Sequence, residues 1–209
     1  MNRHTIQGQI ENCTKCAAIQ GVQCGSSPAV YEGTAKIKAM IIGHSPRTNR
    51  GNVAETVLNM SDIDNALYKY IHEGILTPLR LTDQEIYCTN LIKCFTADKP
   101  EDVERTNKGY IAEIFENCAK LLEREIELIN PEIIISLSQT VLALLSGKYG
   151  AGKQQMSETF ATIQTLNIAD KEIQFIPCVH IRVRYRKRYC PAQTERLIQL
   201  SNKIKLNEA

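Results

Sequence analysis

The sequence predicts an α/β fold: a central four-stranded parallel sheet between two layers of helices, in a three-layer α/β/α arrangement. Short apolar segments typical of buried strands alternate with segments of helical periodicity. The length of 209 residues fits a single domain, which we expect to span residues 1–209. Hydrophobic residues make up 43% and charged residues 23%, so the composition excludes disordered, collagen-like and coiled-coil proteins.

The first half of the chain supplies two of the strands and one helix. An apolar run at residues 37–42 predicts a buried strand that Gly43 ends. Apolar residues then recur at helical spacing over residues 61–73, with Ser61 or Asp62 as the N-cap and Gly74 as the stop. Residues 85–88 predict the second strand.

The middle of the chain carries the strongest helical pattern. Residues 108–129 place their apolar side chains on one stripe, and Asn130-Pro131 stops the helix. The most apolar strand follows at residues 133–137, and the next helix is expected at residues 139–145. Glycine and glutamine are frequent in residues 146–157, which predicts a mobile loop.

The last part of the chain predicts the fourth strand at residues 173–176, then a basic loop, then a closing helix over residues 192–204. Ligands of such sheets bind beyond the carboxyl ends of the strands. We therefore expect the segments that follow the four strands to converge on one cleft that holds His44, Asn90 and His180. These segments are residues 43–47, 89–93, 138–140 and 180–184.

The charge and the cysteines limit the choice of partner and compartment. The formal net charge is only +2, but residues 182–188 carry five cations in seven positions, a pattern that fits either a phosphate contact or a solvated face. The N-terminus has no signal-peptide pattern and no apolar run approaches about 20 residues, so we expect a cytoplasmic protein with no membrane partner. The eight cysteines then favour metal or cluster ligation over disulfides.

Four motifs occur in an informative order. A C-x-x-C pair joins Cys13 and Cys16, G-x-x-P spans residues 43–46, T-N-x-x-K-C spans residues 89–94, and a late strand ends in His180. In this order they resemble the uracil-DNA glycosylase superfamily, in particular its thermophile-type, family 4-like branch that carries an iron–sulfur cluster. The resemblance extends from Cys13 to about Leu200 and implies the three-layer fold predicted above.

The resemblance implies a cofactor bound by an N-terminal segment. Its residue-by-residue transfer gives Cys13, Cys16, Cys94 and Cys118 as ligands of a 4Fe–4S cluster. Cys118 also fits a buried core thiol, because it lies on the apolar stripe of its helix, and Cys24 is then the substitute ligand. Zinc in a four-thiolate site is the alternative metal.

The implied activity is that of a DNA N-glycosylase, which hydrolyses the bond between uracil, or another deaminated base, and deoxyribose after flipping the base out of the DNA. Asn90 would read the edge of the base, His180 would stabilise the departing anion, and His44 is the third catalytic candidate. The first-motif loop would bind substrate and place the water. Its candidates are Gly43, Ser45, Pro46 and Arg47.

The resemblance also implies a DNA-binding loop at residues 181–188, with Val183 or Tyr185 as a wedge in the vacated stack. The DNA-binding candidates are Arg182, Arg184, Tyr185, Arg186, Lys187 and Arg188. We expect the protein to act on damaged DNA as a monomer.

Two departures from the family pattern bear on catalysis. The first motif, normally Gly-Glu-Ala-Pro-Gly, is Gly-His-Ser-Pro-Arg here, so His44 or Glu55 is left to replace the missing carboxylate. The G-R-P-F-x-G segment with its stacking aromatic ring is absent, which leaves Val53, Leu58 or a residue of the mobile loop as the platform for the base. Two functions remain as alternatives to a DNA glycosylase: a noncatalytic iron–sulfur protein that binds nucleic acid, and a metal-stabilised hydrolase of free nucleosides or nucleotides.

Overall fold

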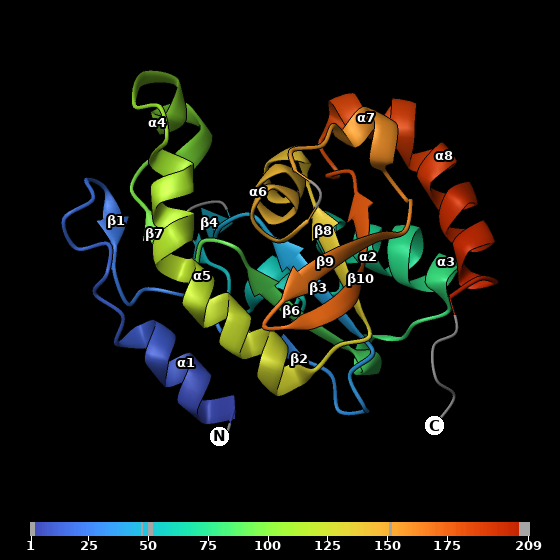
Figure 1. The fold of residues 1–209 in the computed structure, drawn as a ribbon, viewed down its shortest axis with the longest axis horizontal. Coiled ribbons are helices and arrows are strands. Elements are labelled where there is room, and N and C mark those ends of the chain that lie inside the picture. The colour runs from blue at the N-terminus through green and yellow to red at the C-terminus, as the bar shows by residue number, and fades with distance from the viewer. Residues whose placement is uncertain (1–2, 47, 50–51, 151, 205–209) are drawn as a thin grey trace.

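The computed structural model describes residues 3–46, 48–49, 52–150 and 152–204, with the backbone alone for residues 3–5, 48–49, 52–53 and 183–186. Its main sheet has six strands in the order β2-β6-β3-β8-β10-β9 (Figure 1). The four inner strands are parallel and confirm the predicted central sheet; they are β6 (Ile86–Asn90), β3 (Ala39–Gly43), β8 (Ile133–Leu137) and β10 (Lys171–Cys178).

Two antiparallel edge strands extend the predicted sheet. They are β2 (Tyr31–Glu32), which pairs with β6, and β9 (Gln164–Ile168), which pairs with β10. The sequence analysis did not predict them: β2 has only two residues, and the alternation of polar and apolar side chains in β9, typical of an edge strand, extends over only five. The inner strands β3, β6 and β8 are buried along their whole length, which explains their continuous apolar runs.

Helices cover both faces of the sheet and give the three-layer α/β/α arrangement. In Figure 1, α5 (Tyr110–Ile129) crosses in front of the strands and α2 (Ala66–Ile71) lies behind them. Phe115 and Leu122 from α5 share one apolar core with the strands and with Ile71 from α2. The long helix predicted at residues 108–129 is confirmed, and Asn130 in the left-handed conformation ends it.

Further helices and two short strand pairs complete the described part of the chain. The helices are α1 (Arg3–Glu11), η1 (Val57–Asn59), η2 (His72–Leu76), α3 (Thr77–Leu79), η3 (Asp83–Glu85), α4 (Pro100–Thr106), α6 (Gln139–Tyr149), α7 (Met156–Thr159) and α8 (Val183–Ser201). Two further strand pairs are β1 (Val22–Gln23) with β7 (Phe95–Thr96), and β4 (Thr48–Asn49) with β5 (Asn52–Val53). Within the described part of the chain, no helix is both long and apolar enough to cross a bilayer.

The helix predicted at residues 61–73 starts later and continues further. Its N-cap is Asn65, whose side chain accepts a hydrogen bond from the Leu67 N–H at 2.9 Å. Gly74 does not stop it, because the chain continues as the π-helix η2 and then as α3, and so buries Leu76 and Leu79. The left-handed residue Arg80 provides the stop.

Two predictions in the second half are also corrected. Residues 146–157 were expected to form a loop, but α6 runs on to Tyr149 and α7 begins at Met156. The closing helix α8 begins at Val183, with Pro191 inside it. Proline prefers the first turn of a helix, which is why the sequence placed the start near residue 192. The basic segment is therefore the first two turns of α8 and not a loop.

Candidate functional site

A cavity of about 730 Å³ lies at the carboxyl ends of the parallel strands. Each inner strand contributes residues to its lining, as the strand-end argument predicts. They include His44 after β3, Asn90 at the end of β6, Ser138 after β8 and His180 after β10. The side chains of Asn90 and His180, 90 positions apart in the sequence, therefore face one hollow.

Asn90 is held at the floor of this cavity by the sheet. It is 4% exposed and stands opposite Gly43 in the β3–β6 register. A Cβ on Gly43 would lie 2.5 Å from Asn90 Oδ1 and 2.6 Å from Leu58 Cδ2. Only glycine leaves room for this amide, which can donate one hydrogen bond and accept another.

The first-motif loop is tied to the end of β6. The Leu91 N–H donates to the Gly43 carbonyl at 2.8 Å, and the Ile92 N–H donates to the His44 carbonyl at 2.9 Å. Gly43, Ser45 and Pro46 line the cavity, and Ser45 is buried. Arg47, the fourth substrate-binding candidate of this loop, lies outside the described residues.

Leu58 forms the apolar wall beside Asn90. Its backbone is left-handed, with φ of 59°, a conformation that costs free energy for a leucine and that tends to occur at functional sites. Of the other candidate platforms, the side chain of Val53 is outside the described residues, whereas Met156 from the expected loop lines the cavity. Tyr189 also lines it and packs edge-on against Phe160, with ring centroids 5.4 Å apart.

His180 is oriented by its own chain. The backbone N–H of Arg182 donates to His180 Nδ1 at 3.2 Å, so the neutral ring carries its proton on Nε2. The preceding residue, Val179, is fixed by a buried pair: its N–H donates to Gln193 Oε1 at 2.7 Å, and its carbonyl accepts from the Tyr70 hydroxyl. Gln193 also donates to the Tyr70 oxygen at 2.9 Å, and burial raises the pKa of Tyr70, which keeps the hydroxyl protonated.

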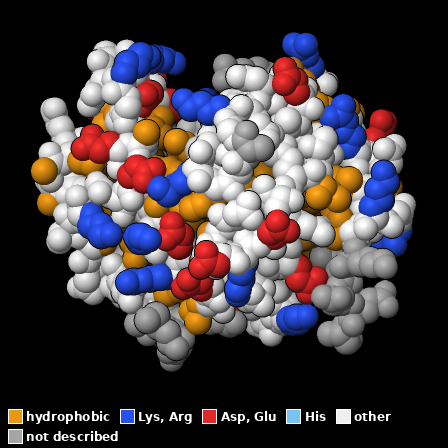
Figure 2. Space-filling model, in the orientation of Figure 1, with side chains coloured by type: hydrophobic (Ala, Val, Ile, Leu, Met, Phe, Trp, Pro, Cys, Tyr) orange, Lys and Arg blue, Asp and Glu red, His pale blue; other side chains and the backbone are white. Residues whose placement is uncertain are grey.

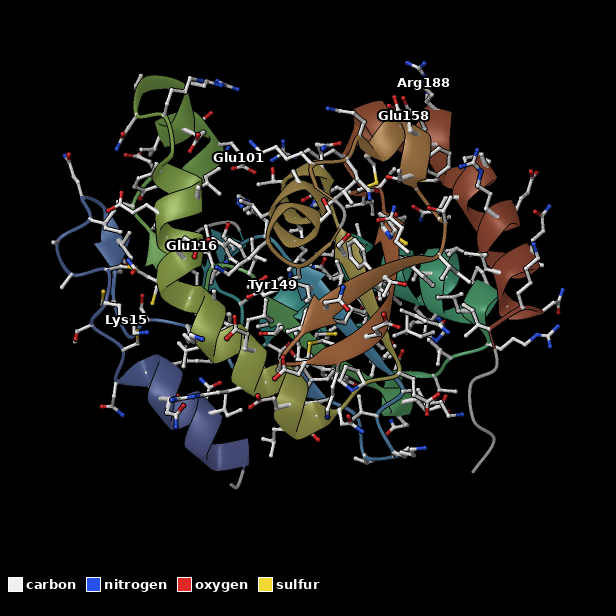
Figure 3. All side chains as sticks on the ribbon, viewed as in Figure 1. Lys15, Glu101, Glu116, Tyr149, Glu158 and Arg188 are labelled. Carbon is white, nitrogen blue, oxygen red and sulfur yellow. The ribbon has the colours of Figure 1, made fainter. Side chains whose placement is uncertain are left out.

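His44 meets a carboxylate that the sequence argument missed. Glu101, on α4, lines the cavity with its Oε1 3.4 Å from His44 Nδ1 and 3.4 Å from Arg182 Nη2. Figure 3 labels Glu101 between α4 and α6, on the side of the sheet toward which the parallel strands point. Glu55, the alternative to His44 as replacement for the missing carboxylate, is exposed and is not part of this lining. Glu101 lies in α4, in the interval between Cys94 and Cys118.

The basic segment lies at the rim of the cavity. Arg182 lines the cavity, and Lys187 and Arg188 are exposed on α8. Arg188, labelled in Figure 3, lies at the outer end of this region and places its guanidinium 5.1 Å from the Tyr189 ring centroid. The side chains of Val183, Arg184, Tyr185 and Arg186 are outside the described residues. Elsewhere on the face shown in Figure 2, basic and acidic side chains are interspersed.

Five cysteines gather where the N-terminal segment meets α5. The pairing of β1 with β7 brings the N-terminal segment next to Cys94. Burial raises the pKa of Cys16 and of Cys94, and both are raised further by Cys13 and Cys24. Burial raises the pKa of Cys118 to about 11, against the opposing effect of Lys93, and Cys16 and Cys94 add to the rise. The thiolates of this group therefore repel one another, which a cation between them would relieve.

The donor chemistry of this thiol group fits an iron–sulfur cluster or zinc, both of which take thiolate ligands. In the ranges that the structure describes, no three or more Cys, His, Asp or Glu side chains are already arranged as a metal site. Cys118 does lie on the buried stripe of α5, as expected, but it packs in one apolar cluster with Cys16 and not in the main core. Cys24 packs against the same cluster. Cys88 and Cys178 are buried in the sheet.

A buried ion pair joins the thiol group to the strand of Asn90. Lys93, from the T-N-x-x-K-C motif, pairs with Glu125 on α5 and donates to Thr89 Oγ1 at 2.7 Å. Thr89 and Tyr87 each donate to Glu125 Oε1 at 2.9 Å. The motif lysine thus fixes the end of β6 to α5, a role that the sequence did not reveal.

Comparison with known proteins identifies the family of the chain. The model of the Uracil DNA glycosylase superfamily matches residues 30–200. A type-4 uracil-DNA glycosylase from Saccharolobus solfataricus is 26% identical over 179 residues, which cover 86% of this chain and 75% of the relative. The type-4 enzyme from Sulfurisphaera tokodaii is 24% identical over 177 residues, 84% of this chain and 72% of the relative. The chain belongs to the uracil-DNA glycosylase superfamily and is similar to its type-4 branch.

Proposed function

We propose that the protein is a DNA repair glycosylase that hydrolyses the N-glycosidic bond of uracil, or of another deaminated base, in DNA. The observation that carries this proposal is the cavity shared by Asn90 and His180 at the carboxyl edge of the sheet. Its volume of about 730 Å³ lies within the range of cavities that hold small organic molecules, about 300–1,000 Å³. The type-4 names of the two relatives support the same activity.

Asn90 selects the base in this proposal. Its amide offers an acceptor for the N3–H of uracil and a donor for the O4 atom. Cytosine presents the opposite pattern at these two positions and would leave both groups of the buried amide unpaired. An unpaired buried polar group costs about 1–3 kcal/mol, which disfavours cytosine.

His180 and the first-motif loop act on the bond that breaks. As the base leaves, negative charge grows on it, and a preorganised donor near O2 lowers the barrier. The tautomer set by Arg182 gives His180 the Nε2–H that such a donor needs. His44 and the loop residues Gly43, Ser45, Pro46 and Arg47 bind the substrate and place the attacking water.

The start of α8 grips the DNA next to the flipped nucleotide. A helix N-terminus carries partial positive charge, and cations in its first turns add to the attraction for phosphate. We assign this role to Arg182, Arg184, Tyr185, Arg186, Lys187 and Arg188. Because the contacts go to phosphate, raising the salt concentration should weaken DNA binding.

The thiol group holds the cofactor. We assign Cys13, Cys16, Cys94 and Cys118 as ligands of a 4Fe–4S cluster, with Cys24 as the substitute for Cys118 and zinc as the alternative metal. When bound, such a group stabilises the packing of the N-terminal segment on α5 and β7. The protein's own residues carry the hydrolysis.

A labelled oligonucleotide with one uracil tests the proposed function. Formation of an abasic site by the purified protein, and not by the protein with both Asn90 and His180 changed to alanine, supports it. Binding of the uracil, hypoxanthine and xanthine oligonucleotides without cleavage of any of the three contradicts it and favours a noncatalytic binding protein. Turnover of free nucleosides alone contradicts it and favours a nucleoside hydrolase.

A further inference from the structure

A carboxylate from another element reaches the cavity beside the first motif, which has none of its own. Glu101 stands at the second position of the helix α4, after Pro100, and reaches the same cavity as His44. Its Oε1 is 3.4 Å from His44 Nδ1. The side chain of His44 is 9% exposed and that of Glu101 is 28% exposed, so the pair lies at the inner part of the rim and not in open solvent.

The imidazole of His44 is otherwise without a fixed partner. Both of its ring nitrogens are buried, and neither forms a hydrogen bond of good geometry with any described residue. Buried polar atoms of native proteins are generally hydrogen-bonded, so a cavity-lining imidazole in this state is suited to a ligand or a water molecule. Glu101 favours the tautomer with the proton on Nδ1, which leaves the lone pair on Nε2.

We propose that Glu101 is a positioning residue that holds His44 in the tautomer whose Nε2 accepts a proton from the attacking water. This inference rests on the proposed glycosylase function. The water oxygen bonds to C1′ of the deoxyribose, and the C1′–N1 bond breaks with its electron pair going to the base. The water proton goes to His44 Nε2 and from there to solvent, and the released base anion takes a proton from solvent.

Glu101 also connects the two histidines of the cavity. Arg182 places its guanidinium 3.4 Å from Glu101 Oε1, while the backbone N–H of the same residue orients His180. The Glu101 carboxylate therefore lies between His44 and Arg182, the residue whose backbone orients His180. A purely structural role, in which Glu101 only anchors Arg182, predicts weaker DNA binding and an unchanged chemical step.

Single-turnover excision at saturating protein separates the two roles. Glu101→Gln keeps the size of the side chain and removes its charge. We expect it to lower the excision rate by about 100-fold, the effect typical of losing general-base assistance, while DNA affinity changes little. Asp102→Asn is the matched control, because Asp102 is the next residue of α4, is half-exposed, and pairs with Arg105 at 3.2 Å. Its rate should equal that of the unchanged protein.

A double-mutant cycle tests whether Glu101 acts through His44. If it does, Glu101→Gln combined with His44→Gln is no slower than His44→Gln alone, because the two residues act as a unit. If the rate losses of the two single variants multiply in the double variant, the residues act independently and the proposal is overturned. An unchanged rate in Glu101→Gln would overturn it as well.

The histidine tautomer gives a readout that does not depend on turnover. In ¹⁵N NMR spectra of the DNA-free protein, His44 should carry its proton on Nδ1, and Glu101→Gln should move it toward the Nε2-protonated form. The same tautomer in both proteins would contradict the proposal. If the unchanged protein excises no deaminated base, the proposed function fails; if it excises one and Glu101→Gln does so at full rate, only the role of Glu101 fails.

Discussion

At the scale of single residues, the site depends on side chains that follow strands. Asn90 and His180 could be predicted because each lies at or just beyond the end of an apolar strand, and parallel strands bring their carboxyl ends to one edge. Glu101 could not be predicted in this way. It lies on a short helix in the interval between Cys94 and Cys118, and nothing local in the sequence says where that helix packs.

Asn90→Ala and His180→Ala should each lower uracil excision by about 100-fold or more, because each removes a preorganised hydrogen-bonding group. Single-turnover rates on a uracil-containing duplex measure this. Circular dichroism confirms that the variants are folded. Full activity in both variants would refute the roles assigned to these two residues.

Gly43→Ala should lower excision by up to about 100-fold, because the new Cβ would meet Asn90 Oδ1 at 2.5 Å and push the amide out of place. Gly147→Ala is the control: Gly147 lies within α6, and the nearest atom to its added Cβ is 3.8 Å away. The control should keep its activity and gain slightly in stability, as alanine favours a helix. Equal rates for the two variants would contradict the close fit at Gly43.

At the scale of elements, β3, β8 and α5 were predictable: β3 and β8 are buried apolar runs, and α5 repeats its apolar residues at helical spacing. The two-residue strand β2 has too little pattern to find. The start of α8 was misjudged because Pro191 is typical of a helix start, whereas the structure places it inside the helix. Packing against the rest of the protein, and not the local sequence pattern, determines where β2 forms and where α8 begins.

The buried pair between β6 and α5 gives a prediction at this scale. Glu125→Ala should lower the free energy of unfolding by about 3–5 kcal/mol, because it leaves the Lys93 ammonium, 3% exposed, without its counter-ion. Urea unfolding measures the change. Glu116→Ala, which removes the surface partner of Lys148, should cost no more than about 1 kcal/mol. If Glu125→Ala also lowers the free energy of unfolding by no more than about 1 kcal/mol, the pair of Lys93 and Glu125 contributes little to stability.

Replacing the whole pair separates the cost of an unpaired charge from the value of the pair. Lys93→Met combined with Glu125→Leu should recover most of the stability that Glu125→Ala loses, since apolar side chains of similar volume often replace buried ion pairs at little cost. The same urea unfolding experiment compares the three proteins. A double variant less stable than Glu125→Ala would instead show that Lys93 stabilises the fold without its counter-ion, through its hydrogen bond to Thr89.

At the scale of the whole molecule, the N-terminal segment, α5 and the strand end of Asn90 meet around the thiols. The C-x-x-C pair and the T-N-x-x-K-C motif could be paired from the sequence, through the family resemblance. The sequence could not decide between Cys118 and Cys24, because both pack in the same apolar cluster with Cys16. Their relative positions depend on how α5 packs against the N-terminal loop.

Metal analysis of anaerobically purified protein resolves this choice. We expect about four iron and four sulfide ions per chain, as for a 4Fe–4S cluster. Cys118→Ser should lose them, while Cys190→Ser, on α8 and away from the thiol group, should keep them. Stoichiometric zinc would contradict the cluster assignment, and iron retained in Cys118→Ser but lost in Cys24→Ser would assign Cys24 as the fourth ligand.

The central claim is that Asn90 and His180 hold one flipped base between them. The most direct measurement is NMR of the two labelled side chains during titration with duplexes that carry 2′-fluoro-2′-deoxyuridine, whose fluorine slows cleavage, or 2′-fluoro-2′-deoxycytidine at the same place. We expect that both the Asn90 amide and the His180 imidazole signals shift with the uracil analogue and keep their positions with the cytosine analogue, whose edge does not match the amide. A shift in only one of them, or equal shifts with both duplexes, would contradict it.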